Sequence, residues 1–284
     1  MNMVKYALLN CLFLCLFASC GDSEEMVVEP IGEEQNSCPG TIMGATPMGA
    51  NEVLIWSDEF ETTGSLCTDN WLFDIGNGNG GWGNNESQYY TRENVTIEDN
   101  ILKIKAKKET YRGYSYTSAR IKTQNKFSFT YGRVEVRAKL PSGGGTWPAI
   151  WMLGDNITTV GWPNCGEIDI MEHTGNNQGT TSSAIHNASG YGNTPYVNHL
   201  DRVNDVSTNF HTYGINWTKD KIDFTVDGVV HYTYNPANKT NSNWPFNKPQ
   251  FIILNVAMGG ALGGAIDTAF AESTLEVDYV RVYQ

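Results

Sequence analysis

Residues 166–173 read Gly166-Glu167-Ile168-Asp169-Ile170-Met171-Glu172-His173 and place three carboxylates within an apolar run. The apolar residues between the acids predict a β-strand, in which side chains alternate between two faces. Glu167 and Asp169 therefore share a face, and Glu172 joins them only if one extra residue bulges out around Ile170-Met171. Desolvating three adjacent like charges is costly, so the row indicates a functional site. The alternative is a solvated, acidic outer face.

The rest of the chain also predicts β-strands, and hence an all-β fold. Apolar alternation and turn signals predict about a dozen strands, and no stretch has a sustained 3.6-residue period. The predicted strands cover residues 53–56, 95–98, 101–107, 132–139, 149–153, 181–186, 211–217, 222–226, 229–234, 251–256 and 275–283, with a hairpin turn at Asp99-Asn100. This pattern predicts a β-jelly-roll sandwich of two packed antiparallel sheets.

Length and charge restrict the partners. The chain has 284 residues, 40% of them hydrophobic, which is enough for a sizeable core in one domain. The formal net charge is −12, and no basic stripe interrupts it. Because such a surface repels phosphate backbones, nucleic acid is excluded as a partner, and a neutral polymer is favoured.

The N-terminal segment has the pattern of a targeting signal. Lys5 precedes an apolar stretch, residues 7–18, that is too short to span a bilayer comfortably. Residues 17–20, Phe-Ala-Ser-Cys, resemble a bacterial lipoprotein signal in which Cys20 is lipidated. We therefore expect a signal peptide over residues 1–19, a flexible tether over 20–50 and a catalytic domain over 51–284. The protein is then an outer-membrane lipoprotein, at the cell surface or facing the periplasm; plain secretion is the alternative.

The remaining cysteines and the glycine-rich loop carry weaker signals. Cys38, Cys67 and Cys165 are odd in number, so at least one thiol stays free and no disulfide framework is implied. Residues 76–81 satisfy the G-x-G-x-x-G pattern, but no helix follows them to hold a phosphate. We interpret this segment as a loop.

The acidic row fits glycosidic bond cleavage. Retaining cleavage needs two carboxyl groups about 5–5.5 Å apart, one as nucleophile and one as proton donor. Glu167 as nucleophile, Asp169 as the residue that tunes it and Glu172 as acid/base form a coherent set. A cation site built from the three acids is the alternative, although one rigid strand rarely surrounds a cation.

Tryptophans near the acidic strand suggest a sugar-binding surface. Trp147 and Trp151 are four residues apart, hence on one strand face, with the small Ala149 between them. Trp82 lies in a glycine-rich loop with little core to bury it, which favours the edge of a cleft. The alternative is that these indoles belong to the core.

At this point the chain resembles glycoside hydrolase family 16. Residues 167–172 match its E-x-D-x-x-E signature in the bulged form of the laminarinase branch, and the resemblance covers roughly residues 51–284. Further matching stretches are residues 80–86, 145–153, 162–166 and 277–283. The resemblance implies a concanavalin-like jelly roll with an open cleft and retaining hydrolysis of internal bonds. It assigns Glu167 as nucleophile, Asp169 as its assistant and Glu172 as acid/base.

The resemblance also implies binding residues and partners. Sugar contacts are expected from Trp82, Asn85, Arg120, Trp147, Trp151, His173 and His186. No cofactor is expected for catalysis, but a structural calcium is expected near Glu59, the backbone of Asn100 and Asp278. The implied substrate is β-1,3-glucan (laminarin), with mixed-linkage β-1,3-1,4-glucan as a second substrate, and a monomer anchored to the membrane by its lipid is expected. The alternatives are a galactan hydrolase acting on agarose or carrageenan, and a non-catalytic glycan-binding lipoprotein.

Overall fold

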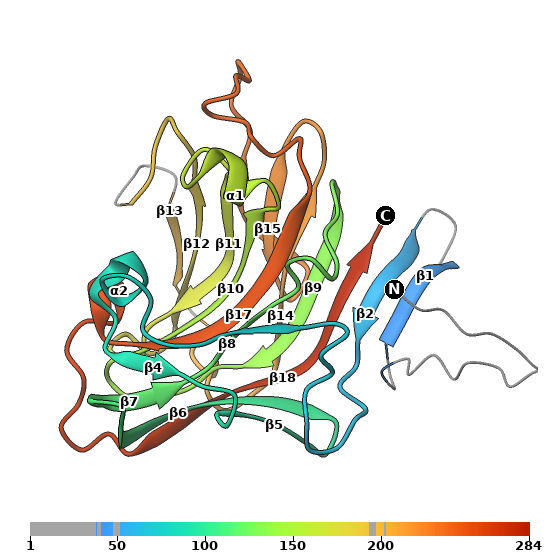
Figure 1. The fold of residues 1–284 in the computed structure, drawn as a ribbon. Helices are drawn as coiled ribbons and strands as arrows, with labels where there is room; N and C mark the ends of the chain where they lie inside the picture. Colours follow the sequence, from blue (N-terminus) through green and yellow to red (C-terminus); the bar gives the residue numbers. More distant parts are fainter. Residues whose placement is uncertain (1–37, 39–40, 48–51, 193–196, 202) are drawn as a thin grey trace, which may run out of the picture. The chain divides into compact units, whose positions relative to one another are not determined.

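The computed structural model describes residues 38, 41–47, 52–192, 197–201 and 203–284. They belong to one compact unit, Asn36–Gln284, which consists mainly of two β-sheets (Figure 1). The predicted signal peptide, Cys20 and most of the predicted tether lie outside the described residues. None of the helices in the described part of the chain is long and apolar enough to cross a membrane.

The larger sheet has eleven strands, most of them in the order β16-β15-β14-β9-β18-β6-β7-β4, while β2 joins at β18, β1 at β2 and β5 at β6. Its pairs are antiparallel except for the parallel pair of β4 and β7, which the sequence pattern did not predict. The strands are β1 (Thr41–Pro47), β2 (Val53–Asp58), β4 (Gln88–Tyr90), β5 (Val95–Glu98), β6 (Ile101–Tyr111), β7 (Tyr114–Ser118), β9 (Gly132–Lys139), β14 (His211–Trp217), β15 (Ile222–Val226), β16 (Val229–Tyr234) and β18 (Glu272–Tyr283).

The second sheet has the acidic strand β11 beside its central strand β10, in the order β13-β12-β11-β10-β17-β8-β3. Its strands are β3 (Leu72–Asp74), β8 (Arg120–Lys122), β10 (Thr146–Gly154), β11 (Glu167–His173), β12 (Thr180–His186), β13 (Val197–Asp201) and β17 (Gln250–Met258). Three short helical segments accompany the sheets: η1 (Gly81–Asn85), α1 (Ile157–Val160) and α2 (Gly260–Gly263).

The hydrophobic core contains apolar side chains from both sheets. In β9, Val134, Val136 and Ala138 are buried and alternate with half-buried charged residues, as the period of two requires. In β17 all nine residues are buried, so this mainly apolar strand is covered on both faces where it pairs between β10 and β8. Burying a large apolar side chain contributes about 1.5–3 kcal/mol, so these strands hold the second sheet firmly.

The prediction of an all-β sandwich is confirmed, as is the hairpin at Asp99-Asn100, where Glu98 pairs with Ile101. The predicted tether differs from the structure in its last part. Residues 41–47 form β1, which pairs antiparallel with β2. Cys38 is joined to Cys67 by a disulfide, a pairing that the cysteine count could not assign, and Cys165 is free and buried.

Candidate active site

Strand β11 contains the bulge that the acidic row requires. Between Asp169 and Glu172, two residues of β11 oppose a single residue of β12, and the register with β10 shifts at the same place. Ile170 has no partner in either register. One extra residue on one strand of an antiparallel pair is a β-bulge.

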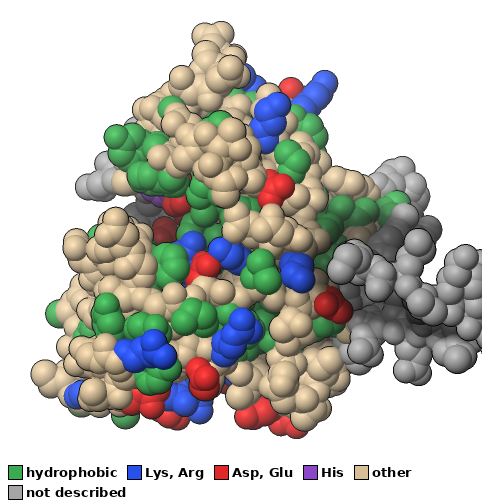
Figure 2. All heavy atoms as spheres, viewed as in Figure 1, with side chains coloured by type: hydrophobic (Ala, Val, Ile, Leu, Met, Phe, Trp, Pro, Cys, Tyr) green, Lys and Arg blue, Asp and Glu red, His purple; other side chains and the backbone are tan. Residues whose placement is uncertain are grey.

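Because of the bulge, the apolar side chains of β11 point into the core and its three acidic side chains point into a cavity. Ile170 and Met171 are consecutive, yet both pack in the hydrophobic core. Glu167, Asp169 and Glu172 all line one cavity. The structure therefore brings the three predicted catalytic residues together. Figure 2 shows the molecule hollowed at the left edge of the view, with acidic (red) and histidine (purple) side chains in the hollow.

Two indoles hold the outer carboxylates of the row. Trp147 Nε1–H donates a hydrogen bond of 3.0 Å to Oε1 of Glu172. Trp162 Nε1–H donates one of 2.9 Å to Oε2 of Glu167. One oxygen of each of these two carboxyl groups is thus held by an indole.

His186 lies beside the first two acids. Its Nε2 is 3.1 Å from Oδ2 of Asp169 and 3.7 Å from Oε1 of Glu167. The backbone N–H of Gly192 donates to Nδ1 at 3.0 Å, so Nδ1 is an acceptor and carries no proton. The opposite ring nitrogen, Nε2, is therefore the one that faces the carboxylates of Asp169 and Glu167.

Burial changes the acidity of the row. It raises the pKa of Glu167 to about 8, and the charge of Asp169 adds to the rise, whereas His186 and the Trp162 bond oppose it. Burial alone raises the pKa of Asp169 to about 8. Burial, followed by the charge of Asp169, raises the pKa of Glu172 to about 8, and the Trp147 bond opposes it. At neutral pH the row therefore retains protons, which a proton donor requires.

Aromatic side chains form the walls of the cavity. Trp147, Trp151 and Trp82 line it, as predicted. The Arg120 guanidinium lies 4.7 Å from the ring centre of Trp82 and 4.6 Å from that of Trp151, so it is held between two indoles. The carboxylate of Asp74 forms an ion pair with Nε of Arg120, at 3.0 Å. Such cation–π contacts fix the loop that carries Trp82 against the floor of the sheet.

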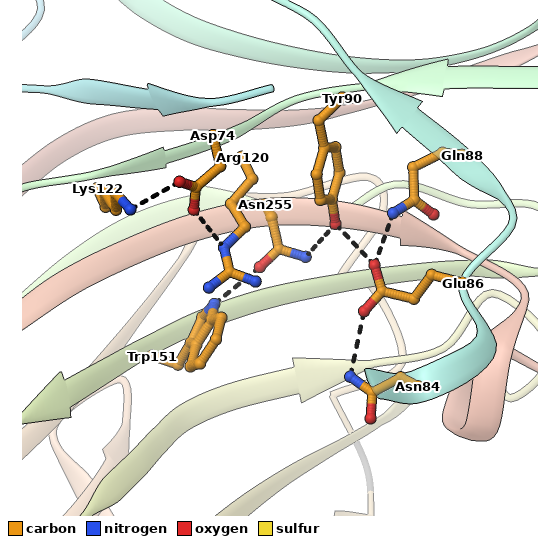
Figure 3. A network of polar contacts seen from close by, with 9 residues as sticks. All are labelled: Asp74, Asn84, Glu86, Gln88, Tyr90, Arg120, Lys122, Trp151 and Asn255. Atoms are coloured by element: carbon orange, nitrogen blue, oxygen red, sulfur yellow. Dashed lines mark hydrogen bonds and ion pairs between the residues drawn. The ribbon is translucent and has the colours of Figure 1, made fainter. Parts of the chain in front are cut away.

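A polar network continues from the indoles along the cavity (Figure 3). Trp151 Nε1–H donates to Oδ1 of Asn255 at 2.8 Å, and the Asn255 amide donates to the Tyr90 hydroxyl at 3.2 Å. Tyr90 in turn donates to Glu86 at 3.1 Å, and Glu86 also accepts a bond of 2.6 Å from Gln88. Bonded side chains with little freedom make a preorganised surface for a polar ligand.

Three of the residues predicted to contact sugar do not line the cavity: Asn85, His173 and His186, of which His186 lies beside Glu167 and Asp169. Asn85 is exposed and does not line the cavity, while its neighbour Asn84 does. His173 is 2% exposed, and its Nδ1 is bonded to the carbonyl of Thr180 at 2.8 Å. The period of two explains this, because the residue after Glu172 must point away from the cavity.

Several cavity residues were not predicted: Asn84, Glu86, Trp162 and Asn255. Glu86, Gln88 and Tyr90 are spaced by two, which would have indicated one polar face along a short strand. Asn255 is a single amide within the apolar stretch 251–256, and an isolated polar residue in a buried strand is itself a signal.

The residues expected to hold calcium do not fit a cation. The carboxylate of Glu59 accepts bonds of 2.9 and 2.7 Å from the Arg281 guanidinium. Asp278 is paired with Arg137. Since both carboxylates are already neutralised by guanidinium groups, they are not free to bind a hard cation.

Known proteins resemble this chain over most of its length. Residues 83–281 match the model of glycosyl hydrolases family 16. A β-glucanase of Rhodothermus marinus is 44% identical over 251 residues, with 81% of this chain and 85% of that protein covered. Glucan endo-1,3-β-glucosidase A1 of Niallia circulans is 35% identical over 284 residues; the match covers 89% of this chain but 41% of that longer protein. The crystal structure of a laminarinase from Flavobacterium sp. UMI-01 superposes with a TM-score of 0.78 at 46% identity, covering 81% of this chain and 100% of that one.

Proposed function

Because the chain belongs to glycosyl hydrolase family 16, we propose that it hydrolyses internal β-1,3 bonds of glucans such as laminarin, with mixed-linkage β-1,3-1,4-glucan as a second substrate. The observation that carries this proposal is the bulge in β11, since it places Glu167, Asp169 and Glu172 in one indole-lined cavity. The names of the similar glucanases and laminarinase support the choice of substrate.

The first step is formation of a glycosyl-enzyme. The ionised carboxylate of Glu167 attacks the anomeric carbon while Glu172 transfers its proton to the departing glycosidic oxygen. Glu167 takes the nucleophile role that the family signature assigns to it and attacks in its ionised form; burial raises its pKa to about 8, and His186 and the Trp162 bond oppose that rise. Glu172, with a pKa raised to about 8 by burial, is protonated at neutral pH.

The second step releases the sugar. Glu172, now a carboxylate, takes a proton from water as the water oxygen attacks the anomeric carbon, and the Glu167 carboxylate leaves. Two inversions at one carbon retain the β-configuration. Asp169 assists from its place beside His186 Nε2, and its titration is coupled to that of the neighbouring glutamates.

Binding is assigned to the aromatic walls. Sugar rings present apolar C–H faces, and Trp147, Trp151 and Trp82 offer aromatic surfaces to them within the same cavity as the acids. The amides of Asn84 and Asn255 also line it and supply hydrogen bonds for sugar hydroxyls. A polymer lying across such a cleft is cut within its length.

The test is a substrate panel of laminarin, lichenan, agarose and carrageenan with wild-type protein and Glu167→Gln. Wild type should release reducing sugar from laminarin, and to a smaller extent from lichenan, whereas E167Q should lose at least about 10³-fold in kcat. Glu135→Gln, on β9 of the other sheet, is the matched control and should match wild type.

Each outcome separates the candidates. Activity on agarose or carrageenan alone would assign a galactan hydrolase. Laminarin binding without hydrolysis by wild type would assign a glycan-binding protein. NMR of the first laminarin product should show the β-anomer, and an initial α-anomer would contradict the retaining mechanism.

We also propose that the protein is anchored to a membrane. The lipoprotein-like residues 17–20 support anchoring through a lipid on Cys20 at the outer membrane. The wild-type protein should take up labelled palmitate in bacterial cells and sediment with membranes, and Cys20→Ala should do neither. Equal sedimentation of both proteins would contradict the anchor.

A further inference from the structure

Ser183 of β12 is the single residue that opposes the bulge, because its neighbours Ala184 and Ser182 pair with Asp169 and Glu172. Its hydroxyl donates a hydrogen bond of 2.8 Å to the carbonyl oxygen of Ile170, the bulge residue without a register partner. We propose that Ser183, supported by His231, is a positioning residue that holds the bulge and thereby keeps Glu172 in the catalytic row. This inference rests on the proposed function.

The hydrogen-bond inventory of the hydroxyl supports the assignment. A serine hydroxyl has one proton, and the bond to Ile170 uses it. The second contact, 3.3 Å from His231 Nε2, must then be accepted by Oγ from an Nε2–H. Burial lowers the pKa of His231, and both its neutral Nε2–H tautomer and its cation can donate this bond.

The location of Ser183 makes the bond hard to replace. The side chain is 1% exposed and lies on the same face of β12 as Ile185, which belongs to the core. His231 comes from β16 of the other sheet, so the two residues connect the sheets behind the bulge. Because the site is sealed from solvent, removing the hydroxyl leaves the carbonyl of Ile170 without this partner.

The consequence is specific to one end of the row. Glu167 and Asp169 precede the bulge and keep their pairing with β12. Glu172 follows it, so its direction depends on how Ile170 and Met171 are accommodated. A shift of about 1 Å in a catalytic group can cost about 10²-fold in rate. Loss of Ser183 should therefore impair proton donation more than substrate binding or nucleophilic attack.

The test compares Ser183→Ala with wild type on two substrates. With laminarin, kcat should fall about 10- to 100-fold while KM stays within about threefold. With a dinitrophenyl β-glycoside of a laminari-oligosaccharide, whose leaving group needs no proton, the initial burst of dinitrophenolate should keep its wild-type rate within about threefold. Ser183→Thr retains the hydroxyl and should restore most of kcat, and Ser183→Cys, a weaker donor, should lie between Thr and Ala.

Thr123→Val is the matched control. Thr123 is also buried, donates a 2.8 Å bond to a backbone carbonyl, that of Phe127, and accepts a backbone N–H, that of Ile252. T123V should lose stability but keep kcat on both substrates. Wild-type kcat in S183A, or an equal loss on both substrates, would overturn the positioning role. If S183A does not fold, the kcat values of S183T and S183C on laminarin test the positioning role instead. S183T should then be faster than S183C, and equal kcat values would overturn the role. An inactive wild type would instead contradict the proposed function.

Discussion

Trp147 and Glu172 are joined by a hydrogen bond of 3.0 Å from the indole N–H to a carboxylate oxygen. The same indole lines the cavity, so one side chain offers both an aromatic surface for a sugar and a partner for the proton donor. A bond that favours the charged form lowers the pKa of Glu172 and limits the rise that burial causes.

Trp147→Phe separates these two roles, because phenylalanine keeps an aromatic face but has no N–H. The pKa of Glu172 should rise further, and the basic limb of kcat/KM against pH should move upward by about one pH unit. The measurement is laminarin hydrolysis between pH 5 and 10. Trp151→Phe, which loses a bond to Asn255 instead, should leave the limb in place. An unmoved limb in W147F would contradict the link between this bond and the proton donor.

Stability should depend on pH through the same row. The three carboxyl groups have pKa values raised to about 8 in the folded protein, against about 4 in the unfolded chain. Between these two pKa values the folded state binds more protons than the unfolded state. The protonated carboxyl groups therefore contribute stability at low pH, and this stability is lost as pH rises through about 8. The loss is at most about 1.4 kcal/mol per pH unit for each proton. Glu172→Gln should have the same Tm as wild type near pH 4 and a higher Tm at pH 8. A lower Tm of E172Q than of wild type at pH 8 would contradict the expected loss of stability with rising pH.

Arg120 should contribute to binding rather than to chemistry. Arg120→Lys keeps the charge but loses the planar group held between Trp82 and Trp151. Losing about 1–2 kcal/mol of cation–π contact should raise KM for laminarin about 5- to 30-fold, with kcat within threefold. Arg92→Lys, which removes a guanidinium from the ring of Phe73 outside the cavity, is the control and should leave KM unchanged.

The disulfide between Cys38 and Cys67 should stabilise the fold without affecting the site. It closes a loop with a sequence separation of 29 residues, for which chain entropy gives about 3–4 kcal/mol. Cys67→Ser should lower Tm by several degrees and leave kcat unchanged. Reductant should lower the Tm of wild type toward that of the variant and have no effect on C67S; an effect of equal size on both would contradict the pairing.

The features that could be predicted from the sequence are those set by the alternation of side chains along a β-strand. Alternation placed Glu167 and Asp169 on one face and predicted that Glu172 needs a bulge, which the register confirms. It also placed Trp147 and Trp151 on one face with Ala149 between them. Local pattern is sufficient in these cases because neighbouring residues on one strand have a fixed spacing.

Features that depend on distant strands could not be predicted. Arg120 reaches Trp151 only because β8 and β10 flank β17, and Ser183 meets His231 only because the sheets pack. Asn85 and His173 do not line the cavity, because a family motif names positions without giving side-chain direction. The segment 41–47 has the composition of a tether, yet tertiary pairing with β2 makes it a strand.

The extra residue in β11 has a consequence for the shape of the cleft. Deleting Ile170 would leave Glu167, Asp169 and the following glutamate spaced by two, so a regular strand could display all three acids without any bulge. The insertion is therefore not needed to keep the acids on one side. A bulge makes its strand kink and twist more strongly, and in β11 the bulge lies between Asp169 and Glu172, and so between the proposed nucleophile and the proposed proton donor. We therefore expect the extra residue to curve the cleft floor between Glu167 and Glu172, and such a curve would favour a bent glucan over a straight one.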